Sequence, residues 1–384
     1  MKKSIIILAA LIATTAVSCK KEGCTDETAI NYNSKAKKDD GSCTYEIDNG
    51  GIGYTIPSTF TFTDGNGNST VSYSGQTDRL NQLGEMVVYM KTGTSAVLDA
   101  QIIKDMFANV GDNGNGNFSF SSTKQLKNKC FTVDQPLFET FMDEIATASN
   151  DFATTASNGQ AGTLTSGTST YLFDANGVEH VQVIEKGLMG AVFMNQALNN
   201  YFSSAVIDVD NTTAVDPANG KYYTLMEHHY DEAFGYFGVD VDFPSTIPSS
   251  FWGKYCNNQD ASLNSNADMM NNFLKGRAAI SNNVMADRDA AILAIRTEWE
   301  DISAYSAMSY LDDAVGYFGT DNAKFLHVLS EAYAFAWDLR YAPVETRRMD
   351  VVEHAALMAM FNTNFWDMSI ADINAIKSAI DAKY

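Results

Sequence analysis

The chain has 384 residues and a formal net charge of -21 at pH 7. Because nucleic acids and anionic membrane surfaces are themselves negatively charged, this acidity argues against both as binding partners. A chain of this length can bury a substantial hydrophobic core and can divide into two lobes.

Residues 1–18 have the layout of a secretory signal peptide, with two lysines before a short apolar run that ends in small residues. The tetrapeptide Ala16-Val17-Ser18-Cys19 resembles the lipobox of bacterial lipoproteins. This resemblance implies that Cys19 becomes the lipidated first residue, and that an acyl anchor such as palmitate holds the protein in the lipid bilayer. The expected location is the outer membrane or cell surface, with the periplasmic face as an option. The alternative is an ordinary cleaved signal followed by a coincidental cysteine.

Residues 19–53 form the expected link between this anchor and the main domain. An exported chain meets an oxidising compartment, so we expect Cys24 and Cys43 to form a disulfide. It would close a loop of about 19 residues and stabilise that segment by about 3 kcal/mol. Residues 23–45 resemble a short cysteine-framed module of exported Bacteroidetes proteins, and a Gly-rich linker follows at 49–53. Cys130 and Cys256 are either buried free thiols or a long-range bridge.

The main domain is expected over residues 54–384. Its first twenty residues alternate apolar and polar side chains around Asp64-Gly65-Asn66-Gly67-Asn68, which predicts a β-hairpin. Apolar residues at helical spacing, together with capping and breaking residues, then predict about ten helices. These helices cover Leu80–Met90, Leu98–Met106, Asp134–Ile145, Val181–Phe193, a segment starting at Asp216-Pro217, Ala267–Ser281, Asp287–Tyr310, Asn322–Tyr341, Met349–Phe361 and Ser369–Ala382. The sequence therefore predicts a mainly α domain.

One ten-residue motif occurs twice. Residues 231–240 return as residues 312–321, with seven identical positions. Each copy contains Gly-Tyr-Phe-Gly, and Gly238 and Gly319 are placed to end a helix. The repetition predicts a duplicated helical bundle of two similar lobes, covering about 180–260 and 261–341. The competing interpretation is that the motif simply ends helices well.

Residues from about Tyr54 to Tyr384 resemble the domain of unknown function family numbered 4856, found in Bacteroidetes lipoproteins. The segments that carry the resemblance are 74–80, 184–191, 227–238 and 329–333. The family carries no established chemistry, so this resemblance implies fold and location only. A more distant similarity is to imelysin-like envelope proteins, which are duplicated helical bundles marked by Gly-x-His-x-x-Glu. His229 and Glu232 supply His-x-x-Glu here, and Glu227 stands where that pattern has glycine.

Two pairs of histidine and glutamate are candidate metal or ligand sites. On a helix, Glu232 can lie beside either His228 or His229, and His327 and Glu331 repeat this spacing. Imidazole and carboxylate groups bind zinc or iron, and pairs from two lobes can converge on one metal. The competing interpretation is that these side chains cap helices, pair with arginine or face water.

Three further charges border apolar helix faces: Glu185, Arg277 and Arg340. Buried charges need partners. We therefore expect Glu185 or Glu331 to pair with Arg277 or Arg340.

The sequence contains neither a Gly-x-Ser-x-Gly elbow nor a His-Glu-x-x-His motif, which argues against the corresponding hydrolases and zinc peptidases. The first functional hypothesis is a non-enzymatic cell-envelope lipoprotein that binds a small ligand or a metal between its lobes, with iron, haem or zinc as the candidate cofactors. The alternative is a non-catalytic interaction or scaffolding lipoprotein at the surface. An imelysin-like metallopeptidase comes third.

Overall fold

The computed structural model describes residues 21, 23–25, 32–38 and 53–384. The chain divides into two compact units, Met1–Gly53 and Tyr54–Tyr384. The predicted signal peptide, Cys19 and Cys43 lie outside the described residues, whereas Cys24 is described and buried. In the part of the chain that the structure describes, no helix combines the length and apolar character needed to cross a bilayer.

The Tyr54–Tyr384 unit is mainly helical, as predicted. Its α-helices are α1 (Ser74–Lys91), α2 (Ala100–Phe107), α3 (Gln135–Ala148), α4 (His180–Leu188), α5 (Ser204–Ile207), α6 (Leu225–Phe237), α7 (Phe251–Leu263), α8 (Ser265–Ser281), α9 (Met285–Tyr317), α10 (Asn322–Asp338), α11 (Val351–Met360) and α12 (Ile370–Asp381). Two antiparallel hairpins pair β1 (Gly162–Ser166) with β2 (Ser169–Phe173) and β3 (Ala214–Asp216) with β4 (Lys221–Thr224).

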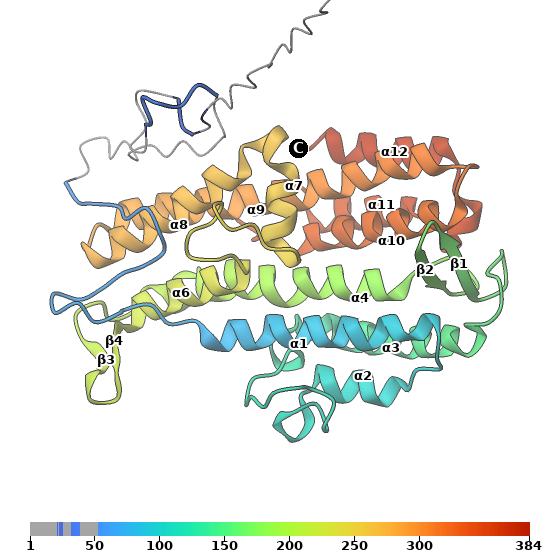
Figure 1. Cartoon of the computed structure of the whole chain (residues 1–384), viewed down its shortest axis with the longest axis horizontal. Coiled ribbons are helices and arrows are strands. Elements are labelled where there is room, and N and C mark those ends of the chain that lie inside the picture. The colour runs from blue at the N-terminus through green and yellow to red at the C-terminus, as the bar shows by residue number, and fades with distance from the viewer. Residues whose placement is uncertain (1–20, 22, 26–31, 39–52) are drawn as a thin grey trace, which may run out of the picture. The chain divides into compact units, whose positions relative to one another are not determined.

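Helix α4 lies in the middle of this unit. Figure 1 shows α1, α2 and α3 on one side of it and α8 to α12 on the other, with the long helices roughly parallel. Helix α4 packs against α1, α3 and α10, and all its residues except Glu185 are buried. A helix buried on all sides is expected to be apolar around its circumference, which makes the charged Glu185 and Lys186 within it unusual.

Helix α4 continues into two π-helical segments, Met189–Met194 and Gln196–Tyr201. The first of these turns packs closely against α10: a Cβ atom on Gly190 would lie only 2.1 Å from Oδ1 of Asp338. Only glycine fits there without displacing the buried Asp338 side chain. Apolar periodicity predicts the helix but not its wider turns, which occur frequently at functional sites.

Helix α7 has no counterpart among the predicted helices. Its sequence includes Gly253 and two adjacent asparagines, which weaken the helical pattern. The predicted capping box of the last helix is confirmed, because the Ser369 side chain accepts the backbone N–H of Asp372.

The hairpin predicted near residue 64 is reduced to a turn closed by one isolated bridge, Thr63 to Ser69. The Asp64 carboxylate accepts the backbone N–H groups of Asn66 and Asn68, so the turn satisfies its own polar groups without strands.

The β3–β4 hairpin lies where we expected a helix to start, at Asp216-Pro217. Pro217 begins a turn between β3 and β4 instead of a helix, and Gly220 ends that turn with φ +77°.

The two copies of the repeated motif occupy different environments. In the first copy, Gly238 ends α6 in the left-handed conformation, and Tyr236 and Phe237 are fully buried. In the second copy, which ends α9, Phe318 is 38% exposed. The same short sequence thus ends a helix in the core in one place and near the surface in the other.

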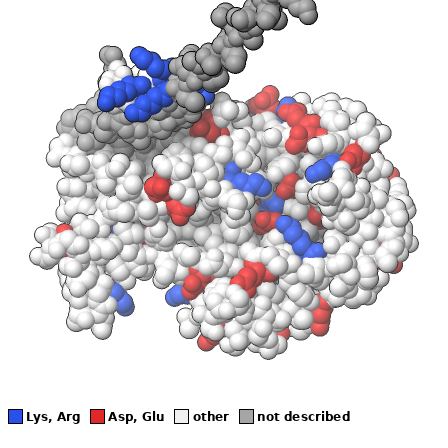
Figure 2. Space-filling model, in the orientation of Figure 1, with Lys and Arg blue, Asp and Glu red and all other residues white. Residues whose placement is uncertain are grey.

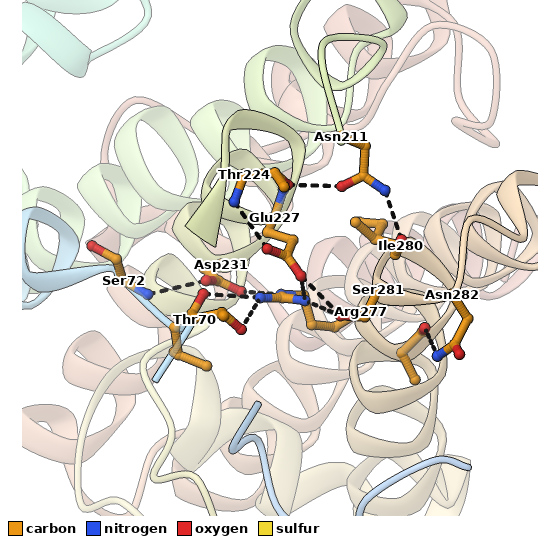
Figure 3. A network of polar contacts seen from close by, with 12 residues as sticks. Thr70, Ser72, Asn211, Thr224, Glu227, Asp231, Arg277, Ile280, Ser281 and Asn282 are labelled. Carbon is orange, nitrogen blue, oxygen red and sulfur yellow. Dashed lines mark hydrogen bonds and ion pairs between the residues drawn. The ribbon is translucent and has the colours of Figure 1, made fainter. Parts of the chain in front are cut away.

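Arg277 of α8 is fully buried and joins three segments of the unit (Figure 3). Its Nε donates to Asp231 at 2.8 Å, and one terminal nitrogen donates to Glu227 at 2.7 Å, both on α6. The other terminal nitrogen donates to the carbonyl oxygen of Thr70 at 2.9 Å. The Ser72 backbone N–H completes the network by donating to Asp231. This network attaches the Tyr54–Tyr73 segment to α6 and α8.

Cys130 and Cys256 are both buried free thiols, which resolves the alternative left open by the sequence. Burial raises the pKa of each thiol well above its usual value, so neither is activated as a nucleophile.

We expect Arg277→Met to lower the free energy of unfolding by about 3–5 kcal/mol, because it leaves two buried carboxylates without their cation. Urea denaturation measures this loss. Replacing Glu227 and Asp231 with leucine in the same chain should recover most of it. A single variant as stable as the natural chain would contradict the role assigned to Arg277.

Candidate functional site

A cleft of about 780 Å³ lies between α1, α4, α7 and α10. On the face shown in Figure 2, basic and acidic side chains lie together near the middle of the molecule, where Figure 1 places α4 and α7. The predicted residues Glu185, His327 and Glu331 all line this cleft, which we call the central cleft. Its size is within the range of small-molecule sites.

A buried lysine organises the floor of the central cleft. Nζ of Lys186 lies 3.0 Å from a carboxylate oxygen of Glu185 and 3.0 Å from one of Glu331. It also donates to the side-chain oxygen of Gln182 one turn earlier on α4. The lysine and Glu331 expose only 5% and 6% of their side chains, so this ion pair is shielded from solvent.

His327 joins this network from α10. Its Nδ1 lies 2.6 Å from Oε2 of Glu179, and its Nε2 lies 3.6 Å from Glu331. An ionised carboxylate only accepts hydrogen bonds, so the Glu179 contact places a proton on Nδ1. The ring of Tyr171 packs on the imidazole with centroids 4.5 Å apart. These contacts fix the ring orientation of His327.

The charges in the network stabilise one another. Burial by itself lowers the pKa of Lys186, but attraction to Glu185 and Glu331 raises it well above its usual value. Burial by itself raises the pKa of Glu331, but attraction to Lys186 and His327 outweighs it and lowers that pKa below its usual value of 4.5. Lys186 and Glu331 are therefore both ionised at neutral pH.

The rim of the central cleft adds further charges and aromatic rings. Lys91, Lys254 and Glu85 also line the cleft, and Phe120, Phe251 and Tyr255 supply the rings. Phe251 has φ +57°, a left-handed conformation that is a true outlier for a bulky residue. A strained backbone conformation of this kind persists only where surrounding contacts stabilise it. Residues with such conformations are found most often at active sites and binding sites.

The other predicted cluster lies in a separate pocket of about 290 Å³, which contains His228 and Glu232. Glu232 accepts from Gln76 at 2.9 Å and from Tyr201 at 3.1 Å, and it lies 3.2 Å from Nδ1 of His229. Burial lowers the pKa of His228, whose Nδ1 lies 2.9 Å from the Ser72 carbonyl oxygen. The carboxylate is thus already satisfied by protein groups.

The two histidine–glutamate pairs line different pockets and are not brought together on one site. Across the described residues, no group of three or more His, Cys, Asp or Glu side chains is arranged to hold a metal ion. Lys186 already supplies the positive charge beside Glu331. The small pocket beside His228 is lined by polar and charged groups, unlike the largely apolar pockets that hold most cofactors. These donor sets fit neither zinc, iron nor haem.

The buried charges find different partners from those we expected. Glu185 and Glu331 pair with Lys186, whereas Arg277 pairs with α6 and Arg340 pairs with Asp134 at 3.2 Å. A basic residue elsewhere in the fold was not needed, because α4 carries its own lysine next to Glu185.

Lys186 and Glu179 are the central residues that sequence reasoning missed. A lysine inside the apolar run from Val181 to Met194 was the available signal, since a charge on a fully buried helix requires buried partners. Glu179 carries no such signal, because it reaches His327 across 148 positions of sequence.

The free energy of unfolding of the Glu331→Gln variant should fall less steeply at acidic pH than that of the natural chain. Because the folded-state pKa of Glu331 is lowered, its contribution to stability is present above pH 4.5 and is lost as the pH falls through the folded value. Denaturation at a series of pH values should show a smaller slope below pH 4.5 and lower stability at pH 7. An unchanged slope would show that Glu331 is not ion-paired in the folded state.

Protein purified without chelator should carry far less than one equivalent of iron or zinc, because the described histidines lack a converging ligand set. The His229→Ala/Glu232→Ala double variant should give the same metal content by mass spectrometry. A full equivalent that disappears in the double variant would overturn this interpretation.

Comparison with known proteins identifies the family of the chain but no activity. No curated protein and no solved structure matches it. A family model described as "Domain of unknown function (DUF4856)" matches residues 57–384, almost all of the Tyr54–Tyr384 unit. The chain therefore belongs to the DUF4856 family.

Proposed function

We propose that this protein is a lipid-anchored envelope lipoprotein that binds a small polar ligand, without chemical conversion, in the central cleft. The observation that carries the proposal is the buried network of Lys186, Glu331 and His327, which opens into a cleft of about 780 Å³. A fixed set of charges in a cleft of this size provides preorganised polar contacts, and rigid contacts lower the entropic cost of binding.

The proposed location rests on the N-terminal sequence. Lys2, Lys3 and the apolar run before Cys19 support export, and the resemblance of residues 16–19 to a lipobox supports lipidation of Cys19. We propose an acyl anchor in the outer membrane, facing the cell surface or the periplasm. A Cys24–Cys43 disulfide would stiffen the segment between this anchor and the helical unit.

Binding is favoured over catalysis because the central charged groups of the cleft, Lys186, Glu331 and His327, already pair with one another or with Glu179. A general acid or base must exchange a proton with its substrate, and its pKa is usually near the working pH. Lys186 and Glu331 instead stabilise each other in the ionised state, and the contact with Glu179 fixes the orientation of the His327 ring. Such a set is suited to orienting hydroxyl or amine groups.

The ligand class is inferred from the balance of charge. Three lysines and three glutamates line the cleft: Lys91, Lys186, Lys254, Glu85, Glu185 and Glu331. A balanced set does not select a strongly charged ligand. Donors and acceptors of both kinds beside the Phe120, Phe251 and Tyr255 rings suit a neutral, hydroxyl-rich molecule with an apolar face. We propose a saccharide.

Gly84 provides a direct test because it lines the cleft from within α1. A Cβ atom there would meet only Phe251, at 4.0 Å, so a side chain can be started at this position without backbone movement. Gly84→Met should place a long side chain in the cleft and weaken saccharide binding more than about tenfold. Because methionine favours helices over glycine, the variant should stay folded.

The matched control is Gly84→Ala. It should keep saccharide affinity and raise the free energy of unfolding by about 0.5–1 kcal/mol. A glycan array followed by calorimetry measures binding for the natural chain and both variants. If no saccharide binds, or if Gly84→Met binds as well as Gly84→Ala, the proposal fails and a scaffolding role gains support. Binding of amino-acid zwitterions in place of saccharides would keep the site but change the ligand class.

A further inference from the structure

Four of the seven arginines of this acidic chain line one pocket of about 680 Å³. The full set is Arg79, Arg277, Arg288, Arg296, Arg340, Arg347 and Arg348, and the four in the pocket are Arg288, Arg296, Arg340 and Arg347. We call it the arginine pocket. It contains neither of the histidine–glutamate pairs, and none of its lining residues lines the central cleft. A ligand bound there is therefore independent of the saccharide proposed for the central cleft.

Two of these arginines are already neutralised. One terminal nitrogen of Arg288 lies 2.7 Å from both Asp208 and Asp289. Arg340 lies 3.2 Å from Asp134, and it also stacks on Trp337 at 4.8 Å. These two side chains have structural partners that explain their positions.

Arg296 and Arg347 have no ion pair with any residue that the structure describes. A terminal nitrogen of Arg296 donates to the carbonyl oxygens of Leu198 and Phe202, each at 3.0 Å, which fixes the guanidinium against the end of the second π-helical segment. Its Nε is buried without a hydrogen-bond partner among the described residues. Buried donors of this kind are nearly always satisfied, by protein, water or ligand.

Arg347 is half-buried, and its side chain forms no hydrogen bond within the described ranges. The carboxylate remaining in the pocket is Glu345, which attracts Arg296 without forming an ion pair with it. Asp208, Asp289 and Asp134 match Arg288 and Arg340, so the pocket groups without an ion pair are two arginines, Arg296 and Arg347, against one carboxylate, Glu345. These unpaired groups carry one excess positive charge in a chain of net charge -21. A local positive excess in an acidic protein favours binding of an anion.

The pocket also has an apolar side. Phe131, Ile292, Leu293 and Val344 form a wall that reaches the surface, where Leu293 is 54% and Val344 66% exposed. Exposed apolar side chains grouped beside unpaired charges mark a surface that contacts another molecule. We call these four residues the apolar wall.

We propose that the arginine pocket binds an amphipathic organic anion. Its carboxylate or phosphate head lies between Arg296 and Arg347, and its apolar body lies against the apolar wall. Guanidinium groups suit both head groups because their parallel N–H donors match pairs of oxygen atoms. The asparagines Asn195 and Asn199 line the same pocket and add neutral polar contacts.

Calorimetry with octanoate and with octyl phosphate tests the proposal on the chain from residue 20 onward, which keeps the whole Tyr54–Tyr384 unit. At least one of the two should bind, and the tighter one identifies the head group. Arg347→Gln should weaken binding about ten- to a hundredfold, since it removes a charged hydrogen-bond donor. Because the Arg347 side chain makes no described hydrogen bond, this variant should unfold at the same temperature as the natural chain.

The matched control is Lys221→Gln, which removes one positive charge at an exposed position of β4. It should leave affinity unchanged. Arg296→Lys supplies a second variant that keeps the charge but loses the paired donors, and it should also weaken binding. The proposal is overturned if neither amphiphile binds, if Arg347→Gln and Lys221→Gln behave alike, if octylammonium binds as tightly as octanoate, or if inorganic phosphate binds as tightly as octyl phosphate.

Discussion

The buried guanidinium of Arg277 fixes the orientation of α6, and the polar pocket beside His228 depends on that orientation. Glu227 and Asp231 are four residues apart and face Arg277 together. His228 and Glu232 each come one position later, so they are turned by about 100° around the helix axis. This rotation directs Glu232 towards Gln76 of α1 and Tyr201. The same helix thus carries one face for the core and a neighbouring face for a polar pocket.

Helix positions were largely predictable, because apolar spacing and capping residues are local properties of the sequence. The central helix, the Pro136 start of α3 and the Ser369 cap of α12 all depend on short-range pattern. The small hairpins were not predictable in the same way, since their strands are at most five residues long. Their turns at Gly167 and Gly220 depend on backbone conformation more than on hydrophobic pattern.

The candidate site shows where sequence reasoning ends. Glu185, His327 and Glu331 could be selected because charges beside apolar runs need partners. Which partner each would find depended on helix packing, and a neighbouring lysine on α4 replaced the expected arginines. The arginine pocket could not be predicted from the sequence for the same reason. Its four arginines come from segments up to 59 positions apart, which meet only in the folded protein. Its positive excess and the balanced charge of the central cleft suit ligands of different chemistry.

The π-helical segments after α4 affect how insertions and deletions in this helix would change the protein within its family. Gln182 and Lys186 line the central cleft from one end of this helix, and Asn195 and Asn199 line the arginine pocket from the other. The first π-helical segment, Met189–Met194, lies between these two groups and sets the angle between them. Loss of a single codon within Met189–Met194 would return that segment to α geometry and rotate the asparagines away from their pocket, while leaving every other residue type unchanged. Relatives are therefore best compared by the length of this segment as well as by its composition.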